Sequence, residues 1–407
     1  MKKYLVGGCV RDALLGLPVQ DHDWVITGAT PAEMLAQGYK QVGKDFPVFL
    51  HPQTKEEYAL ARTERKTGPG YYNFVVDYDP SVTLEEDLAR RDLTINAIAQ
   101  AEDGTIIDPY NGRADLKHKI LRHVSPAFVE DPVRILRVAR FAARFAPLGF
   151  TIAPETMQLM QQMVQAGEVD ALVPERVWQE MQRALTEDAP EVFFTTLRSC
   201  SALVRIFPQL DCLWGIPQKA EHHPEIDTGA HMILCLQQAV KLSNKPEVRF
   251  AVLCHDLGKG ITPKDDWPSH KGHEELGVKL IQDWCKQYHV PNDYRDLAIK
   301  VARFHLHAHR AAELRPDTMV KLFKSLDAFR NSEHLDEYIL CCQADSTGRL
   351  GRQNDPYPNG DLLRKAFSAA NSVDIQPLID KGLTGEKLGD AIMQARIVAV
   401  KNILHKL

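Results

Sequence analysis

The sequence predicts an α/β amino-terminal domain, built as a small mixed sheet with flanking helices, followed by domains that are all α-helical. The first observation is that short apolar or alternating runs bounded by Gly, Pro and Asp gather within about the first 110 residues. The second is that long amphipathic patterns of helical period take over from about residue 116. The third is length, because 407 residues, 44% of them hydrophobic, can fill roughly two to four domains.

Each expected element has a local signature. The β-favouring runs predict five strands, at residues 4–8, 23–27, 47–50, 57–61 and 104–108. Capped patterns among them predict helices at residues 30–38 and 81–100, the second with apolar positions at Leu84, Leu88, Ile95 and Ile98. Amphipathic helices are expected further on, at residues 130–145, 154–164, 174–186, 191–199 and 386–404.

The composition favours a protein of the cytosol. The formal net charge is -5, from 49 Lys and Arg against 54 Asp and Glu, so any nucleic-acid site must be a local patch. The eight cysteines contain no CxxC pair, which suits free thiols in a reducing compartment. No apolar run approaches the roughly 18 residues that a membrane span needs. We therefore expect a soluble, cytoplasmic protein that does not bind membranes.

The first chemically informative residues lie near the amino terminus. Asp21 and Asp23 stand at i and i+2 at the start of an expected strand, so their side chains leave the same face. Carboxylate oxygens are ligands that Mg²⁺ prefers, and phosphoryl transfer commonly uses two such ions. Upstream, Gly7 and Gly8 let a backbone approach a phosphate closely, and Arg11 adds a fork of donors. The two motifs together predict a site for Mg²⁺ and a nucleoside triphosphate.

Five ordered motifs carry a family resemblance. GGCVRDALLG, DHDWVITG, RRDLTINAIA, DPYNGRADL and EDPVRILRVARF, over about the first 145 residues, resemble the head motifs of the class II tRNA nucleotidyltransferase and poly(A) polymerase family. The residues that this resemblance implies are Asp21 and Asp23 for Mg²⁺ and catalysis, Gly8 and Arg11 for the triphosphate, and Arg91 and Asp92 for the ribose and phosphates. It also implies that Asp108 and Gly112 support the metal site, whereas on residues alone DPYNG is a turn.

The segment EDPVRILRVARF predicts a helix with a basic stripe. Its arginines, Arg134, Arg137, Arg140 and Arg144, fall within roughly 120° of a 3.6-residue helix, with apolar residues over the rest. We interpret the stripe as a phosphate-binding surface and place Arg137 and Arg140 in the nucleotide site.

The same helix start bears on base choice. Cytosine and adenine both offer an amino donor beside a ring-nitrogen acceptor, which a carboxylate and a guanidinium can read. The resemblance implies that Asp131 and Arg134 do so and select CTP and ATP. Asp131 before Pro132 also fits plain helix capping.

Two further features of the head stay open. The loop around Gly68, Pro69 and Gly70 fits either a mobile segment that touches the nucleotide or an ordinary hairpin, and the resemblance favours the mobile segment. A third acidic ligand of the metal site is expected from Glu57 or Glu64, with no basis for choosing between them.

A second group of candidate site residues lies in the helical part. His255 and Asp256 close an apolar helix in RFAVLCHDLGKG, and imidazole with carboxylate suits a divalent transition metal or Mg²⁺. Residues 228–345 resemble the HD phosphohydrolase superfamily, which implies hydrolysis of phosphomonoesters or phosphodiesters, with His255 and Asp256 catalytic. The metal ligands that the resemblance implies are His231, His255, Asp256 and Asp345, with His273 and His305 as weaker candidates. A purely structural HD domain remains the alternative.

The expected domains follow from these motifs and from Pro208, Pro217 and Pro224, which predict a linker near residues 215–228. They are a nucleotidyltransferase head at residues 1–115, a neck at 116–145, a tRNA-binding body at 146–227, an HD domain at 228–345 and C-terminal helices at 346–407.

Together the two resemblances imply addition of CCA to the 3′ end of tRNA from CTP and ATP, with Mg²⁺ in the head. The HD domain is expected to use Ni²⁺, Co²⁺, Mn²⁺ or Mg²⁺. The acceptor and T arms of tRNA are the expected contacts, and the protein is expected to be a monomer or homodimer. The alternatives are a poly(A) polymerase, and an RNA-binding phosphohydrolase with an inactive head.

Overall fold

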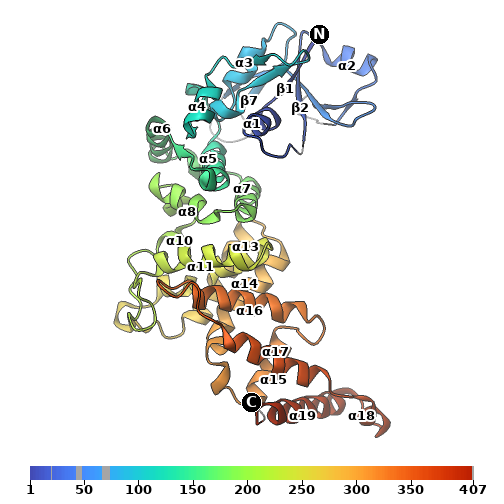
Figure 1. The fold of residues 1–407 in the computed structure, drawn as a ribbon, viewed down its shortest axis with the longest axis vertical. Helices are drawn as coiled ribbons and strands as arrows, with labels where there is room; N and C mark the ends of the chain where they lie inside the picture. The colour runs from blue at the N-terminus through green and yellow to red at the C-terminus, as the bar shows by residue number, and fades with distance from the viewer. Residues whose placement is uncertain (20, 43–47, 67–73, 406–407) are drawn as a thin grey trace. The chain divides into compact units, whose positions relative to one another are not determined.

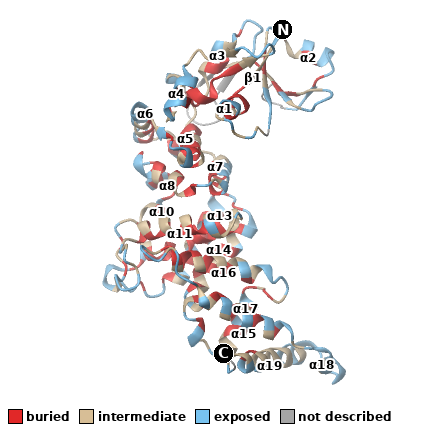
Figure 2. Ribbon diagram, viewed as in Figure 1, coloured by how far each residue is buried: buried red, intermediate tan, exposed pale blue. Residues whose placement is uncertain are grey.

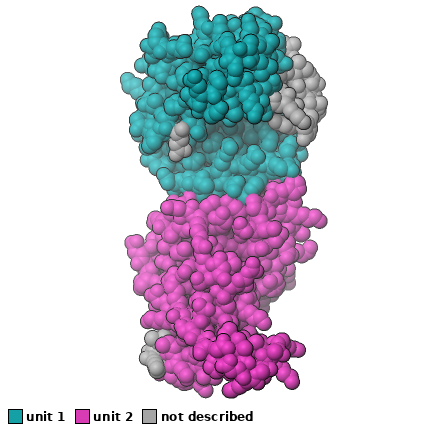
Figure 3. Space-filling model, turned by 90° about the vertical axis from the view of Figure 1, so that its right-hand side faces the viewer, with its two compact units in different colours: residues 1–206 teal, residues 207–407 magenta. Residues whose placement is uncertain are grey.

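The computed structural model describes residues 1–19, 21–42, 48–66 and 74–405, with the side chains of residues 64–66 and 74–76 outside the description. It divides into two compact units, Met1–Ile206 and Phe207–Leu407, which Figure 3 colours separately. The finer division of the sequence into five domains stays a prediction.

A seven-stranded mixed sheet organises the head, in the order β3-β4-β5-β2-β1-β8-β9 (Figure 1). Its strands are β1 (Lys2–Val6), β2 (Asp23–Thr27), β3 (Lys40–Gln41), β4 (Val48–Leu50), β5 (Glu57–Leu60), β8 (Ala99–Ala101) and β9 (Ile106–Ile107). Of the described pairings in this sheet, β2 with β5 is parallel and the others are antiparallel. Separate two-stranded pairs are formed by β6 (Thr63–Lys66) with β7 (Phe74–Asp77), and by β10 (Ile120–Leu121) with β11 (Thr151–Ile152).

Both faces of the sheet are covered by helices. Successive side chains of a strand point to opposite faces, so neighbouring residues of β2 enter two different buried clusters. Val25 of β2 packs in one buried cluster with Leu88 of helix α3 (Leu84–Ala89). Ile26, the next residue, packs in another with Met34 of α2 (Pro31–Ala36). The predicted small mixed sheet with flanking helices is confirmed.

The helix expected over residues 81–100 was wrong beyond its first turns. After α3 the chain turns, forms a short 3-10 helix at Thr94–Asn96 (η1) and then enters β8. The Asp92 carboxylate accepts hydrogen bonds from the backbone N–H of Leu93 at 2.8 Å and from Asn96 Nδ2 at 2.9 Å, which offers the backbone an alternative to helix. Periodicity failed here because the segment is buried on all sides rather than on one face.

The remaining helices of the first unit include α5, which contacts α7 and α8. They are α1 (Gly8–Leu14), α4 (Gly112–His118), α5 (Val133–Phe145), α6 (Pro154–Gln165), α7 (Pro174–Thr186), α8 (Pro190–Ser199) and α9 (Leu203–Ile206).

The second unit is all α-helical. Its helices are α10 (Pro208–Asp211), α11 (Thr228–Leu242), α12 (Pro246–Cys254), α13 (His273–Gln287), α14 (Asn292–His309), α15 (Pro316–Ser325), α16 (Glu333–Thr347), α17 (Pro358–Asn371), α18 (Gln376–Asp380) and α19 (Gly385–Leu404). Figure 2 shows buried residues gathered in α11, α14 and α16. Among the described residues no helix combines the length and apolar character that a membrane span requires.

Candidate active sites

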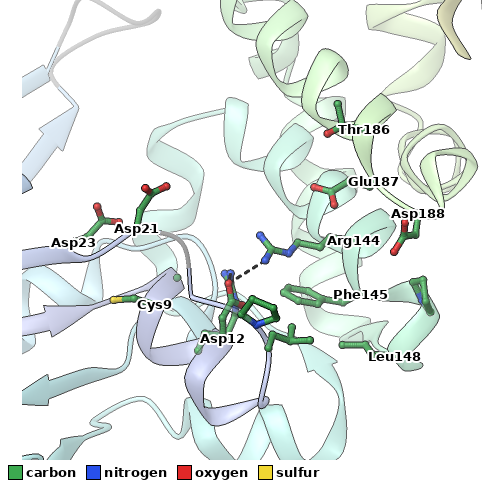
Figure 4. Close-up of a pocket in the computed structure, with 15 residues that line it drawn as sticks. Cys9, Asp12, Asp21, Asp23, Arg144, Phe145, Leu148, Thr186, Glu187 and Asp188 are labelled. Carbon is green, nitrogen blue, oxygen red and sulfur yellow. Dashed lines mark hydrogen bonds and ion pairs between the residues drawn. The ribbon is translucent and has the colours of Figure 1, made fainter. Parts of the chain in front are cut away.

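A cavity of about 620 Å³ lies within the first unit (Figure 4). The first turn of α1 supplies Gly8, Cys9 and Arg11 to its lining, and the chain entering β2 supplies Asp21 and Asp23. The ends of α5 and α7 supply Arg144 and the run Thr186, Glu187 and Asp188. Figure 4 shows Asp21 and Asp23 on one side and the α7 residues on the other. A cavity of this size is typical of small-ligand sites.

The paired carboxylates occupy the place that the sequence predicts. Asp23 begins β2 and lies opposite Glu57 in the parallel register with β5, so their side chains share a face. The next pair, Trp24 and Tyr58, stacks with ring centroids 5.3 Å apart on the other face. Burial raises the pKa of Asp23, the Arg91 charge opposes this rise, and the Asp21 carboxylate adds to it. A divalent cation would stabilise such carboxylates, so the residues fit Mg²⁺.

Gly7 has a left-handed backbone conformation that favours glycine, and it lies close to Arg91. It has a φ of 72°, and a Cβ built on it would lie 2.8 Å from Arg91 Nη1. Arg91 in turn pairs with Asp87 through Nη2 at 3.3 Å.

Arg11 is buried and bound by its neighbour. Its Nε and Nη2 donate to the two carboxylate oxygens of Asp12 at 2.8 and 3.0 Å, and Nη1 donates to Asn96 Oδ1 at 2.5 Å. Asp12 Oδ2 also accepts a hydrogen bond from Arg144 Nη2 at 2.9 Å. Asp12 was not among the residues predicted for the site, although its place directly after Arg11 in the GGCVRD motif was a signal for it.

Most of the predicted nucleotide-binding residues lie in ion pairs outside the cavity lining. Asp92 is buried and accepts from Arg137 Nε at 2.7 Å. Burial alone would raise the pKa of Asp92, but the Arg137 charge and hydrogen bonds from Asn96 and Leu93 hold it well below its usual value. Of the predicted set, all of which the structure describes, only Gly8 and Arg11 line this cavity together with Asp21 and Asp23.

The arginines of α5 all have partners. Arg134 donates to the carbonyl of Ala127 at 2.6 Å and to that of Arg90. Arg140 pairs with Glu180 at 2.6 Å, and both side chains are less than a tenth exposed. Asp131 is held by Arg176 through two hydrogen bonds of 3.1 and 2.7 Å. Nucleotide contact by these residues stays a prediction.

The remaining predictions for the head concern Asp108, the loop at Gly68 to Gly70, and Glu64. Asp108 accepts from the backbone N–H groups of Gly112 at 2.7 Å and Arg113 at 2.9 Å, which fixes the start of α4. The tip of the predicted loop, Gly68 to Gly70, lies outside the described residues, as does the side chain of Glu64.

The second unit brings the predicted HD residues together. His231 of α11, His255 and Asp256 at the end of α12, and Asp345 of α16 are all buried. His231 Nε2 lies 3.1 Å from Asp345 Oδ1, and His255 Nε2 lies 3.2 Å from Asp256 Oδ2 and 3.8 Å from Asp345 Oδ2. Nitrogen and oxygen atoms so arranged fit a divalent transition metal.

Charge in this cluster is balanced between carboxylates and cations. Burial alone would lower the pKa of His255, but the carboxylates of Asp256 and Asp345 raise it to about 9. Burial opposes ionisation of Asp256, yet His255 and Lys259 hold its pKa well below the usual value. Lys259 Nζ lies 2.6 Å from Asp256 Oδ2.

Two partners of the HD residues were not predicted from the sequence. His309 Nε2 lies 2.6 Å from Asp345 Oδ2, and its position four residues after His305 on one helix was an available signal. Glu225 Oε1 lies 2.8 Å from His231 Nδ1. No signal marked Glu225, because it lies in the stretch predicted as a linker.

Three family models match successive parts of the chain. The poly A polymerase head domain matches residues 3–122, the probable RNA and SrmB-binding site of polymerase A matches residues 149–213, and the HD domain matches residues 228–349.

Solved structures share the fold. A CCA-adding enzyme of Bacillus stearothermophilus in complex with CTP is 25% identical, with a TM-score of 0.62 over 98% of this chain and 89% of that one. The Thermotoga maritima CCA-adding enzyme complexed with tRNA is 20% identical, with a TM-score of 0.62 over 100% of this chain and 91% of that one.

Curated relatives match the chain from end to end. The multifunctional CCA protein of Thioalkalivibrio sulfidiphilus is 59% identical, over 99% of this chain and 98% of the relative. That of Nitrosococcus oceani is 58% identical, over 100% and 99%. By its sequence, its three domain matches and its fold, the chain belongs to the multifunctional CCA protein family.

Proposed function

We propose that the head adds the 3′-terminal CCA of tRNA without a nucleic-acid template, using CTP twice and ATP once. We also propose that the HD domain hydrolyses phosphate esters with a divalent metal. The observation that carries the first proposal is the head cavity, which holds Asp21 and Asp23 beside Gly8 and Arg11. The names of the relatives, multifunctional CCA proteins, support it.

In the head reaction the 3′-hydroxyl oxygen of tRNA bonds to the α-phosphorus of the nucleotide. The bond to the β-phosphate breaks, and pyrophosphate leaves. Asp21 and Asp23 would hold Mg²⁺, and the register of β2 with β5 favours Glu57 as the third carboxylate. When bound, Mg²⁺ lowers the pKa of the hydroxyl and neutralises charge on the leaving group.

Base selection is assigned to Asp131 and Arg134. A carboxylate accepts from the amino group of cytosine or adenine, and a guanidinium donates to the ring nitrogen. Arg176 holds Asp131 through one hydrogen bond to each oxygen, and Oδ2 keeps a second lone pair that can accept from the amino group. We expect Asp131→Ala to admit UTP or GTP in a single-turnover assay, and unchanged selectivity would contradict this role.

The partner is tRNA, with its acceptor and T arms bound by the predicted body at residues 146–227 through shape and phosphate contacts. A match to the probable RNA-binding site of polymerase A over residues 149–213 supports this placement. The cytoplasm is the proposed location, and a monomer or homodimer the proposed state.

The decisive experiment supplies tRNA lacking its 3′ end together with labelled CTP and ATP, and sizes the product. Three added nucleotides are expected. A long A tail would indicate a poly(A) polymerase, and no addition would indicate an inactive head. The chain carrying Asp21→Asn and Asp23→Asn is the control and should add nothing.

The HD proposal has its own assay. Hydrolysis of p-nitrophenyl phosphate and of its bis ester is measured with Ni²⁺, Co²⁺, Mn²⁺ or Mg²⁺. We expect activity in the parent chain and in the Asp21→Asn, Asp23→Asn chain, and loss with Asp256→Asn. Activity that survives Asp256→Asn would place the hydrolysis elsewhere.

A further inference from the structure

We propose that Arg349 anchors the phosphate group of the substrate at the HD site. Its guanidinium binds non-bridging oxygens of the phosphate ester, and of inorganic phosphate after hydrolysis, without being a metal ligand. The proposal rests on the phosphate-ester hydrolysis proposed above and deepens it by assigning the side chain that holds the substrate. Neither the predicted metal ligands nor their partners described above include Arg349.

Arg349 lies beside the buried residues predicted to hold the metal. It stands two residues after the end of α16, and its Nη2 lies 3.8 Å from Asp345 Oδ1. Burial raises the pKa values of Cys235, on α11, and of Tyr357, directly before α17, and the Arg349 charge opposes both rises. The guanidinium therefore lies close to side chains of three elements that surround the site.

The guanidinium has hydrogen-bond donors to spare. Its Nε is buried and donates to no residue that the structure describes, and its Nη2 lies beyond hydrogen-bond distance of Asp345. A buried donor without an acceptor is costly. The planar fork of an arginine matches the oxygens of a phosphate, so a bound phosphate would supply the missing acceptors.

The part-exposed rim of the site favours an anion. The side chains of Lys259, His309 and Arg349 are each 10 to 16% exposed, whereas the carboxylates of Asp256 and Asp345 are 6% exposed or less. A ligand that enters from solvent therefore meets these nitrogen atoms before it meets the carboxylates. A group with negative charge and several acceptor oxygens fits such a rim, and a phosphate ester has both.

Arg349 has more free donors than the other cation of the rim. Lys259 Nζ lies 2.6 Å from Asp256 Oδ2 and 2.5 Å from Gln218 Oε1. An ammonium group has three N–H bonds, so these two partners leave Lys259 only one for a substrate. We therefore assign the main phosphate contact to Arg349.

The test compares Arg349→Met with Arg352→Met in the full chain that carries Asp21→Asn and Asp23→Asn. Arg352 is an exposed arginine three residues further on, which makes it the matched control. We measure kcat and KM for p-nitrophenyl phosphate, the inhibition constant of inorganic phosphate, and Co²⁺ binding by equilibrium dialysis. Arg349→Met should raise both KM and the inhibition constant at least about tenfold, because a charged hydrogen bond to phosphate is lost. Its kcat should change less, and its Co²⁺ binding should stay the same. Arg352→Met should keep all four values.

The conservative variant Arg349→Lys retains the charge and should recover part of the phosphate affinity, and it serves as the test if Arg349→Met fails to fold. Unchanged KM and inhibition constant in the Arg349 variants would overturn the proposal and leave the hydrolase intact. Weaker Co²⁺ binding with an unchanged inhibition constant would also overturn it, because Arg349 would then act on the metal ligands alone. No hydrolysis by the parent chain with any of the four metals would overturn the hydrolase and this proposal together.

Discussion

The ion pair between Arg140 and Glu180 offers a sharp test of what the α5 arginines do. Arg140 Nε lies 2.6 Å from Glu180 Oε2, and the two side chains are 8% and 7% exposed. At that distance the gross attraction is about 6 kcal/mol with an effective dielectric constant of about 20, offset by the cost of desolvating both charges. Glu180→Gln removes this attraction, but the desolvation cost of the buried Arg140 charge remains.

We expect Glu180→Gln to lower the free energy of unfolding by about 3 kcal/mol, the lower end of the range for broken buried pairs. The lower end applies because Glu187 Oε1 remains 3.8 Å from Arg140 Nη1. The chain with both Arg140→Met and Glu180→Met should stay within about 1 kcal/mol of the parent, since neither charge is then buried. Urea unfolding, with hydrogen exchange of α5 and α7 amides to localise the effect, measures both.

A decrease of less than about 1 kcal/mol in the free energy of unfolding of Glu180→Gln would refute this reasoning. So would a double variant whose decrease equals the sum of the decreases in the two single variants. The double variant also tests the predicted nucleotide contact. If Arg140 touches the triphosphate, the folded double variant should bind CTP at least about tenfold more weakly, the effect of about 1.4 kcal/mol. Unchanged CTP affinity would make Arg140 purely structural.

Three further predictions follow from single contacts. Gly7→Ala should destabilise the head by more than Gly16→Ala in urea unfolding: both positions have positive φ, 72° and 70°, but only Gly7 has a close neighbour, Arg91. Glu225→Gln should weaken Co²⁺ binding by about 10- to 100-fold in dialysis, because the carboxylate orients His231, and equal affinity would contradict it. The lowered pKa of Asp92 stabilises the head above about pH 4, and this stability is lost as the pH falls. Asp92→Asn should therefore lower stability at pH 7 and flatten its decline in acid, as followed by thermal unfolding across pH.

Patterns of neighbouring residues in the sequence predicted the strands and helices whose formation depends on those neighbours. The strands expected near residues 4–8 and 23–27 are present as β1 (Lys2–Val6) and β2 (Asp23–Thr27), because consecutive apolar residues of a strand point to opposite faces and are buried when both faces are covered. The helix predicted over residues 81–100 was wrong beyond α3. Burial on all sides hides the helical period there, and the hydrogen bond that the Asp92 side chain accepts from the Leu93 N–H favours a turn after α3. Helical period placed the α5 arginines on one stripe, but it could not show that Asp92 and Glu180 come to meet them.

By itself the sequence determined the fold class, the paired carboxylates and the HD motif, because each depends on residues close together in the chain. Tertiary structure alone decided that Glu57 lies beside Asp23, that Asp12 binds Arg144, and that His273 and His305 meet at Asp256. The physical reason is that charge and coordination act through space over a few ångströms. Such neighbours are set by the packing of distant elements, which no local pattern records.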